Sequence, residues 1–214
     1  MGIFSKHSYP PFFETYLHTF KAKKKNLTNT RFVVFDTETT GLNLHNDRIL
    51  SIGCIAIQNF SIVVADQLEI YVKQEKFAKE SVKIHGLLKF GVFTKVDELE
   101  ALKVFLNYIK NSVLVAHHAA FDIGMINAIL KRNHLPKLKN KVIDTATFYK
   151  KTKYVKDNNQ YSLDKLCAIF NLKMHDRHTA AGDAYLTALV FLKSYKLLQK
   201  KKKNLRLSHF VGWL

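Results

Sequence analysis

The sequence has few cysteines, no long apolar run and few acidic residues. Its two cysteines, Cys54 and Cys167, both lie inside apolar stretches, and no CxxC pair is present. This argues against a zinc site and favours buried free thiols in a reducing compartment. No segment approaches the ~18 consecutive apolar residues that read as a membrane-spanning helix, and the N-terminus lacks the apolar core of a signal peptide. These absences predict a cytoplasmic protein with no membrane partner.

Acidic side chains are scarce, because 17 Asp and Glu residues stand against 34 Lys and Arg residues and give a formal net charge of +17. Such a surface is typical of proteins that bind polyanions such as nucleic acid, and a merely well-solvated basic surface accounts for the same numbers. Hydrophobic residues make up 47% of the 214 positions, enough for the core of one globular domain.

The apolar patterns predict strands and helices in alternation after three initial strands. Short turns between the first three strands favour antiparallel neighbours. The later helices favour an α/β fold, with a mixed sheet flanked by helices. The expected strands cover residues 31–36, 49–58, 62–72, 113–116 and 141–143, and the expected helices cover residues 99–109, 122–131, 144–149, 162–170 and 183–200.

The two ends differ in composition from the segment between them. Residues 1–30 are predicted to form a basic helical N-terminal extension, since apolar residues at helical spacing follow Pro10-Pro11. The lysines at 21–25 are interpreted as a linker, with a phosphate-contacting arm as the alternative. Residues 31–198 are predicted to form the main domain. Residues 199–214 form a basic and apolar tail, which is either a packed extension or a docking segment.

The first motif that carries chemistry is the segment Phe35-Asp36-Thr37-Glu38 at the end of a wholly apolar strand. Asp36 and Glu38 are two positions apart, so both side chains point to one face of the strand. Two neighbouring carboxylates repel each other unless a cation lies between them. Oxygen ligands suit Mg²⁺ or Mn²⁺. The alternative is an exposed acidic pair at a strand end.

Two further motifs place an aspartate near the start of a helix. In residues 117–122, Asp122 follows the apolar strand 113–116, and in residues 178–183, Asp183 follows His178. Taken alone, an aspartate at a helix start often only caps the helix or interacts with its dipole. A histidine upstream of a third carboxylate fits a general base that activates water.

Together these three motifs resemble the DEDDh family of 3′-to-5′ exonucleases, which includes the proofreading epsilon subunit of bacterial DNA polymerase III. The resemblance covers roughly residues 31–195, and the stretches 84–87, 143–145 and 163–167 support it. Three motifs in this order are far more specific than one alone. The resemblance implies a ribonuclease-H-like fold with a five-stranded mixed sheet flanked by helices.

The resemblance also implies a role for each matched residue. Four carboxylates would bind two divalent metal ions, Mg²⁺ or Mn²⁺, with Asp36 bridging both, and His178 would act as general base. The residue after His117 is His118, where many relatives have Asn, which puts the local hydrogen bonding in question. The implied metal ligands are Asp36, Glu38, Asp122 and Asp183, and the implied substrate contacts are Thr39, Leu42, His85 and Phe121.

The expected function is therefore a 3′-5′ exonuclease that releases nucleoside 5′-monophosphates from single-stranded nucleic acid, with DNA favoured over RNA. The alternatives are a nucleic-acid-binding accessory module of a polymerase and an RNA-trimming exoribonuclease. The expected partners are single-stranded DNA or RNA 3′ ends and a DNA polymerase subunit. The short segment after the main domain favours a stand-alone enzyme.

Overall fold

A mixed sheet forms the centre of the computed structural model, which describes residues 9–21, 26–75, 93–154 and 160–211. The strand order among these residues is β4-β3-β2-β1-β5-β6. Strands β1, β2 and β3 are antiparallel neighbours, whereas β5 and β6 run parallel to β1 and β4 runs parallel to β3. The strands are β1 Phe32–Thr39, β2 Ile49–Gln58, β3 Ser61–Val72, β4 Lys95–Val96, β5 Val113–Ala116 and β6 Val142–Asp144.

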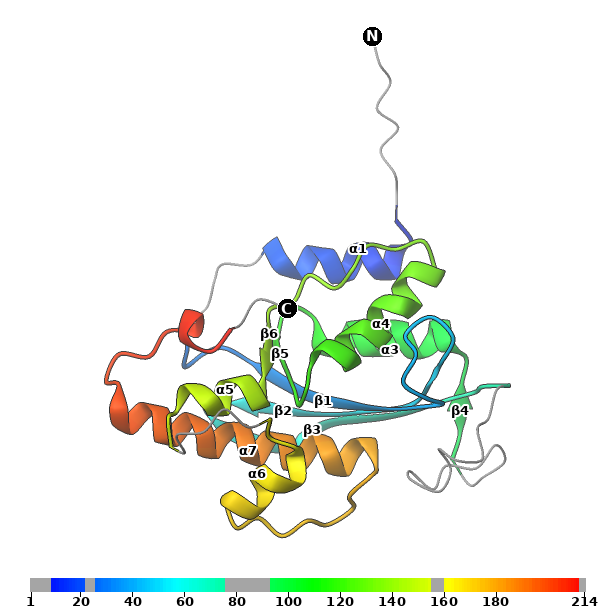
Figure 1. Cartoon of the computed structure of the whole chain (residues 1–214). Coiled ribbons are helices and arrows are strands. Elements are labelled where there is room, and N and C mark those ends of the chain that lie inside the picture. The colour runs from blue at the N-terminus through cyan, green and yellow to red at the C-terminus, as the bar shows by residue number, and fades with distance from the viewer. Residues whose placement is uncertain (1–8, 22–25, 76–92, 155–159, 212–214) are drawn as a thin grey trace.

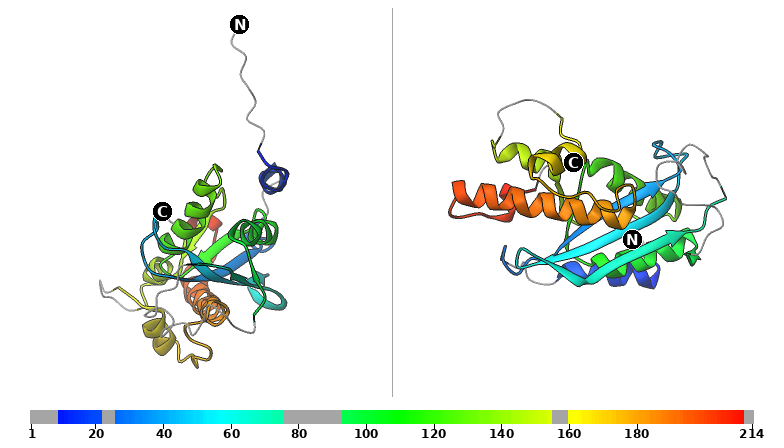
Figure 2. Two further views of the ribbon diagram at one scale, coloured as in Figure 1. Left: turned by 90° about the vertical axis from the view of Figure 1, so that its right-hand side faces the viewer. Right: turned by 90° about the horizontal axis from the view of Figure 1, so that it is seen from below.

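Helices cover both faces of this sheet (Figures 1 and 2). Helices α1, α3 and α4 lie on one face, and α5, α6 and α7 lie on the other. The α-helices are α1 Pro11–His18, α3 Glu98–Ile109, α4 Ala120–Arg132, α5 Thr145–Lys151, α6 Leu163–Ile169 and α7 Ala180–Lys201, and two short 3₁₀ turns, η1 Thr19–Lys21 and η2 Leu207–His209, complete the described elements.

The predicted α/β fold with a mixed sheet is confirmed, but the expected number of five strands is wrong. The described residues contain a sixth strand, β4, which is only two residues long. A strand that short has no alternation to reveal it. The other strands and helices lie within a few residues of their predicted positions. Ser162 caps α6 and accepts a hydrogen bond from the Lys165 amide.

Strand β1 is buried on both faces, which explains its unbroken apolar run. Phe32 and Val34 pack toward α5 and α7, whereas Val33 and Phe35 pack toward α3 and α4. The alternation therefore assigns the even-numbered side chains of β1 to the α7 face, and this decides where the carboxylates further along the strand point.

Helix α1 is packed onto the body of the molecule. Phe13 and Tyr16 are buried in the same hydrophobic cluster as α3 and α4. The Tyr16 hydroxyl donates to Asn140 Oδ1 at 2.6 Å and accepts from the Lys139 amide at 2.8 Å. In the described part of the predicted N-terminal extension, α1 is therefore a helix that covers the core. Lys23 to Lys25 fall outside the described residues.

The other terminal segment is packed as well. Phe210 is buried, and its ring lies 5.2 Å from the ring of Phe148 between centroids. Phe210 therefore anchors the described end of the tail to the core, and residues 212–214 lie outside the described part. Cys54 and Cys167 are buried free thiols, as predicted. Among the described residues, no helix combines the length and the apolar character that crossing a membrane requires.

Candidate metal centre

The site lies where β1 continues beyond its parallel neighbour. Strand β1 pairs with β5 as far as Val34, opposite Val115, and β5 ends at Ala116. Strand β2 accompanies β1 through to Thr39. Asp36 and Glu38 therefore lie on a part of β1 that has the β5 strand end on one side, where chain segments following β5 can approach them.

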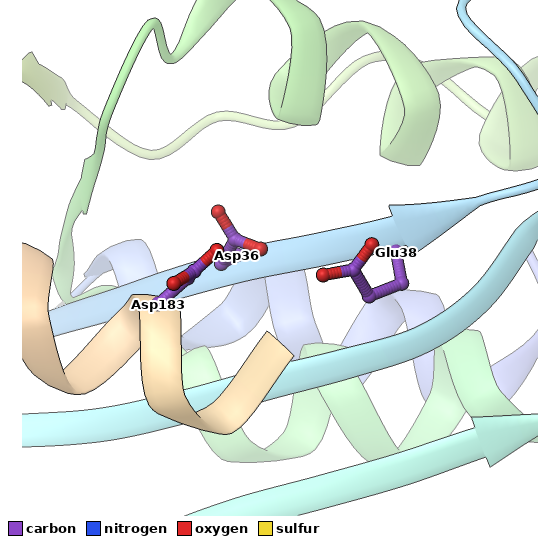
Figure 3. A group of neighbouring side chains, drawn as sticks. All are labelled: Asp36, Glu38 and Asp183. Atoms are coloured by element: carbon purple, nitrogen blue, oxygen red, sulfur yellow. The ribbon is translucent and has the colours of Figure 1, made fainter. Parts of the chain in front are cut away.

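A close backbone contact brings α7 to these carboxylates. Gly53 of β2 is paired with Asp36, and a Cβ added at Gly53 would lie 2.2 Å from the carbonyl carbon of Ala180 in the first turn of α7. Only glycine permits this approach. It places Asp183 beside β1, and carboxylate oxygens of Asp36, Glu38 and Asp183 lie within 4.8 Å of one another (Figure 3).

The loop before α7 folds tightly against the start of that helix. A Cβ at Gly182 would lie 2.0 Å from the Asp176 carbonyl oxygen. Thr179 is the N-cap, and its hydroxyl accepts from the Gly182 amide at 3.1 Å. His178 is exposed on this loop with a left-handed φ of 64°, a conformation that is uncommon outside glycine. Because this loop leads directly into the first turn of α7, it places His178 next to Asp183.

The fourth carboxylate comes from the opposite face of the sheet. Asp122 lies in the first turn of α4, and its Oδ1 accepts two hydrogen bonds from Thr37, from the amide at 3.0 Å and from the hydroxyl at 2.7 Å. Thr37 lies between Asp36 and Glu38 on β1, so these bonds tie α4 to the centre of the acidic segment. Asp122 stands beside the group of three described above without belonging to it.

Burial and mutual repulsion both disfavour the charged forms of these side chains. Burial, followed by the charges of Asp122, Asp183 and Glu38, raises the pKa of Asp36 well above its ordinary value. Burial, followed by the charges of Asp183 and Asp122, raises the pKa of Glu38 to about 7. Burial raises the pKa of Asp122 to about 7 although the bonds from Thr37 lower it. A divalent cation relieves this repulsion.

The donor set fits a hard cation. All the converging ligand atoms are carboxylate oxygens, which Mg²⁺ and Mn²⁺ prefer. In addition, Asp183 Oδ1 is buried and has no hydrogen-bond partner among the described residues. A buried carboxylate oxygen without a donor is costly unless a cation binds it. The residues present therefore suit a divalent metal ion.

One cation of the protein already contacts this group. The Nη1 of Arg177 donates to Asp183 Oδ2, and its Nε donates to Asp164 Oδ1 at 2.6 Å. The charge of Arg177 lowers the pKa of Asp183, whereas burial, the larger cause, raises it. Sequence reasoning missed Arg177, Thr37 and Gly53. Arg177 is one of many basic residues in the chain, and nothing in its position distinguishes it except that it precedes His178.

The expected substrate contacts lie around the end of β1. Leu42 is 83% exposed, on a loop held by Asp47, which accepts from the Thr40 hydroxyl at 2.9 Å and from the Asn43 amide at 2.9 Å. Thr39 is buried, and its hydroxyl donates to the Gly41 carbonyl. Phe121 is partly buried against the core cluster of α3 and α4. His85 falls outside the described residues.

Residues at the start of α5 hold the turn between β5 and α4 by hydrogen bonds. His117 Nδ1 lies 2.8 Å from the Thr145 hydroxyl, and Asp144 accepts from the Ala119 amide at 2.7 Å. Burial, the largest cause, lowers the pKa of His117 to about 4, so that its ring is neutral at neutral pH. His118 has a left-handed φ of 55°, a region that asparagine also adopts. These bonds hold the start of the helix that carries Asp122.

An α/β fold with partly buried carboxylates that converge at the end of its central strand is suited to metal-dependent hydrolysis. The chain belongs to the RNase T family of exonucleases, a class of phosphodiester hydrolases: the family model described as "Exonuclease" matches residues 33–191.

Two curated relatives illustrate the range of this family. The chain is 34% identical over 179 residues to the DNA polymerase III subunit epsilon of Buchnera aphidicola subsp. Schizaphis graminum, covering 78% of this chain and 75% of the relative. It is 37% identical over 170 residues to the DNA polymerase III PolC-type of Caldanaerobacter subterraneus subsp. tengcongensis, covering 79% of this chain and 12% of the relative. The chain thus spans about an eighth of the length of the PolC-type relatives.

Solved structures of the family share the fold. Exonuclease I from E. coli in complex with a dT13 oligonucleotide superposes with a TM-score of 0.68 at 15% identity, over 81% of this chain and 42% of that chain. Exonuclease X in complex with 5′ overhanging duplex DNA superposes with a TM-score of 0.59 at 21% identity, over 82% of this chain and 95% of that chain. These similarities establish the ribonuclease-H-like fold of the DEDD exonucleases.

Proposed function

We propose that the protein is a 3′-5′ exonuclease that removes nucleotides from the end of single-stranded DNA with the help of two divalent metal ions. The observation that carries this proposal is the convergence of Asp36, Glu38 and Asp183, with Asp122 beside them, at the end of β1. The epsilon relatives are named as DNA polymerase subunits, which supports DNA as substrate and a polymerase subunit as partner.

In this proposal the four carboxylates would hold Mg²⁺ or Mn²⁺, and the bound ions would lower the pKa of the attacking water and neutralise charge on the phosphate. His178, exposed beside Asp183, takes the proton from that water as general base. The water oxygen forms a bond to phosphorus while the bond from phosphorus to the 3′ oxygen breaks. The terminal nucleotide leaves as a nucleoside 5′-monophosphate, and the remaining strand keeps a 3′ hydroxyl.

In the same proposal, residues around the acidic group contact the bound DNA strand. Leu42, which is 83% exposed, packs against the terminal base. Thr39 and Phe121 border the acidic group from the end of β1 and the start of α4. The net charge of +17 attracts the phosphate backbone, so that binding weakens as salt rises.

The test is digestion of 5′-labelled single-stranded DNA and RNA of one sequence, with Mg²⁺ or with chelator. We expect a ladder shortened from the 3′ end, Mg²⁺ dependence, and faster digestion of DNA. Asp36→Asn is expected to cut the rate by roughly a thousandfold or more, because a metal ion contributes several kcal/mol to such a reaction.

The matched control is Asp97→Asn, which changes an exposed aspartate at the start of α3 whose side chain makes no capping hydrogen bond. It is expected to digest DNA at the wild-type rate. Shortening from the 5′ end, or digestion by Asp36→Asn at the wild-type rate, would refute the proposal. Binding without shortening would favour an accessory nucleic-acid-binding module, and faster digestion of RNA would favour an exoribonuclease.

A further inference from the structure

Arg177 bridges two carboxylates at the rim of the metal centre. Its Nη1 donates to Asp183 Oδ2 and its Nε donates to Asp164 Oδ1 at 2.6 Å. The two partners differ in exposure, because the Asp183 side chain is 9% exposed and the Asp164 side chain is 55% exposed. The guanidinium thus joins a carboxylate of the buried acidic group to a carboxylate in contact with solvent.

The position of this guanidinium matters because the acidic group carries an unbalanced negative charge. Among the described residues, the ion pairs recorded for the acidic group involve Arg177 alone. Its charge also lowers the pKa values of Asp36 and Glu38, although burial of those carboxyl groups is the larger and opposing cause. Arg177 therefore acts as a counter-ion for the whole group, not for Asp183 alone.

A metal ion and this guanidinium would use the same carboxylate. One oxygen of Asp183, Oδ2, is bonded to Arg177, and the other, Oδ1, has no partner in the described part of the chain. A divalent ion bound to Asp183 would lie within a few ångströms of the guanidinium, and like charges at that distance repel strongly in a partly buried site. Metal binding therefore opposes the Arg177–Asp183 pair.

We propose that Arg177 is a built-in counter-ion that occupies Asp183 in the metal-free protein and is displaced toward Asp164 when a metal ion binds. Asp164 is suited to receive it because it already holds one nitrogen of the guanidinium and lies at the surface. By this competition Arg177 sets the metal concentration at which the site fills. The inference rests on the proposed function, since it requires Asp183 to be a metal ligand.

The test is direct measurement of Mn²⁺ affinity by calorimetry and by electron paramagnetic resonance of free Mn²⁺, without nucleic acid. Arg177→Gln removes the competing charge and keeps a hydrogen-bonding side chain. We expect its dissociation constant for Mn²⁺ to fall by about tenfold, which corresponds to about 1.4 kcal/mol. The thermal stabilisation by Mn²⁺ is expected to be larger for this variant than for the wild type.

The matched control is Arg132→Gln. Arg132 forms an ion pair of similar length and exposure with Glu98, at 2.6 Å and with side chains 27% and 22% exposed, between α4 and α3. Its loss removes a partly buried arginine pair without changing the charge at the metal centre. The Mn²⁺ affinity of this variant is expected to equal that of the wild type.

A second substitution covers the case in which the glutamine variant does not fold. Arg177→Lys keeps the charge, but a single ammonium cannot reproduce the planar fork that holds two carboxylates. We expect its Mn²⁺ affinity to lie between those of the wild type and Arg177→Gln, at about threefold tighter than the wild type.

The outcomes separate this inference from the proposed function. If the wild type binds Mn²⁺ and both Arg177 variants bind it no more tightly, the inference is overturned while the metal site stands. If the wild type binds no Mn²⁺, or if Asp36→Asn binds it as well as the wild type does, the proposed function fails and the inference fails with it. Tighter binding by Arg177→Gln, with Arg132→Gln unchanged, supports the inference.

Discussion

The two sides of the candidate metal centre hold their carboxylates in different ways. On the α4 side, Asp122 is oriented by two neutral donors, the amide and the hydroxyl of Thr37. On the α7 side, Asp183 is paired with the charged guanidinium of Arg177. Neutral donors can remain when a metal ion binds the other carboxylate oxygen, whereas a cation at the same carboxylate must give way. Asp122 on the α4 side is thus already oriented for a metal ion, whereas Asp183 on the α7 side is paired with a cation that would compete with the metal.

Among changes that leave the carboxylates in place, the largest effect is expected from separating the α7 side from β1. In Gly53→Ala the new Cβ would lie 2.2 Å from the carbonyl carbon of Ala180, a backbone atom that no rotamer change can move. We expect the free energy of unfolding to fall by about 3 kcal/mol and the exonuclease rate to fall on the order of a hundredfold. Denaturant unfolding and the rate of DNA shortening measure these changes.

Gly124→Ala is the control for this substitution, because its Cβ would meet only the flexible Leu44 side chain, at 2.9 Å. Helix α4 also gains stability when a glycine is replaced, by up to roughly 1 kcal/mol. Equal behaviour of the two variants would show that the backbone contact does not position Asp183.

The next effect is expected on the α4 side. Thr37→Val removes the hydroxyl that donates to Asp122 at 2.7 Å but leaves the shape of the side chain nearly unchanged. Loss of a group that orients a metal ligand typically costs 10- to 100-fold, so we expect a decrease on the order of tenfold in rate and in Mn²⁺ affinity.

Thr187→Val in α7 is the matched control for Thr37→Val. The Thr187 hydroxyl is also buried, but it has no hydrogen-bond partner among the described residues. Its removal is expected to leave rate and metal affinity unchanged. If Thr37→Val behaved like this control, the Thr37 hydroxyl would not be needed to orient Asp122.

A smaller effect is expected from pH on the metal-free protein. The pKa values of Glu38 and Asp122 are raised to about 7 from ordinary values of 4.5 and 3.8. The folded protein therefore binds more protons than the unfolded chain in this interval, and these groups make it less stable as pH rises from about 4 through 7. We expect the melting temperature with chelator to be about 3 °C lower at pH 8 than at pH 5.

Saturating Mg²⁺ should remove this decline, because metal binding stabilises the ionised carboxylates. Glu38→Gln should reduce it, because one of the titrating groups is gone. Measuring the melting temperature across this pH range, with chelator and with Mg²⁺, tests both expectations. A melting temperature that rose with pH in chelator for the wild type and fell for Glu38→Gln would contradict the raised pKa of Glu38.

The smallest effect is expected at Leu42. This residue belongs to neither the α4 side nor the α7 side, so its substitution serves as a reference for the other two. Leu42→Ala removes an 83% exposed side chain, so the free energy of unfolding is expected to stay within 0.5 kcal/mol of the wild type. If the side chain packs on the terminal base, KM for short single-stranded DNA should rise about threefold, for a lost contact of about 0.7 kcal/mol. An unchanged KM would remove Leu42 from the substrate contacts.

Much of the fold was predictable from the sequence because the core strands are continuous apolar runs. The pattern of β1 also predicted that Asp36 and Glu38 share a face, since alternation is a local property of the strand. The positions of Asp122 and Asp183 near helix starts were equally local; the helices begin two and three residues earlier than expected, and both aspartates lie in the first turn. The resemblance of the three motifs supplied the expectation that these carboxylates converge.

The remaining features depend on contacts between distant segments. The contact of Gly53 with Ala180 joins residues more than a hundred positions apart, and a glycine in a strand gives no sign of what approaches it. Arg177 is distinguished only by the two carboxylates that the fold brings to it. Helix α1 was expected from its periodicity, but its place over the core depends on Asn140 and Lys139, far along the chain.

The Gly53 contact has a consequence for how such an enzyme can change over time. Because backbone lies directly against backbone there, the gap between Asp36 and Asp183 is set by the thickness of two peptide chains and not by side chains that vary. Substitutions on the loops and on the basic surface can then alter which strand is bound while the spacing of the carboxylates stays constant. The fold in this way separates the part of the molecule that is free to diversify from the part that must keep its dimensions.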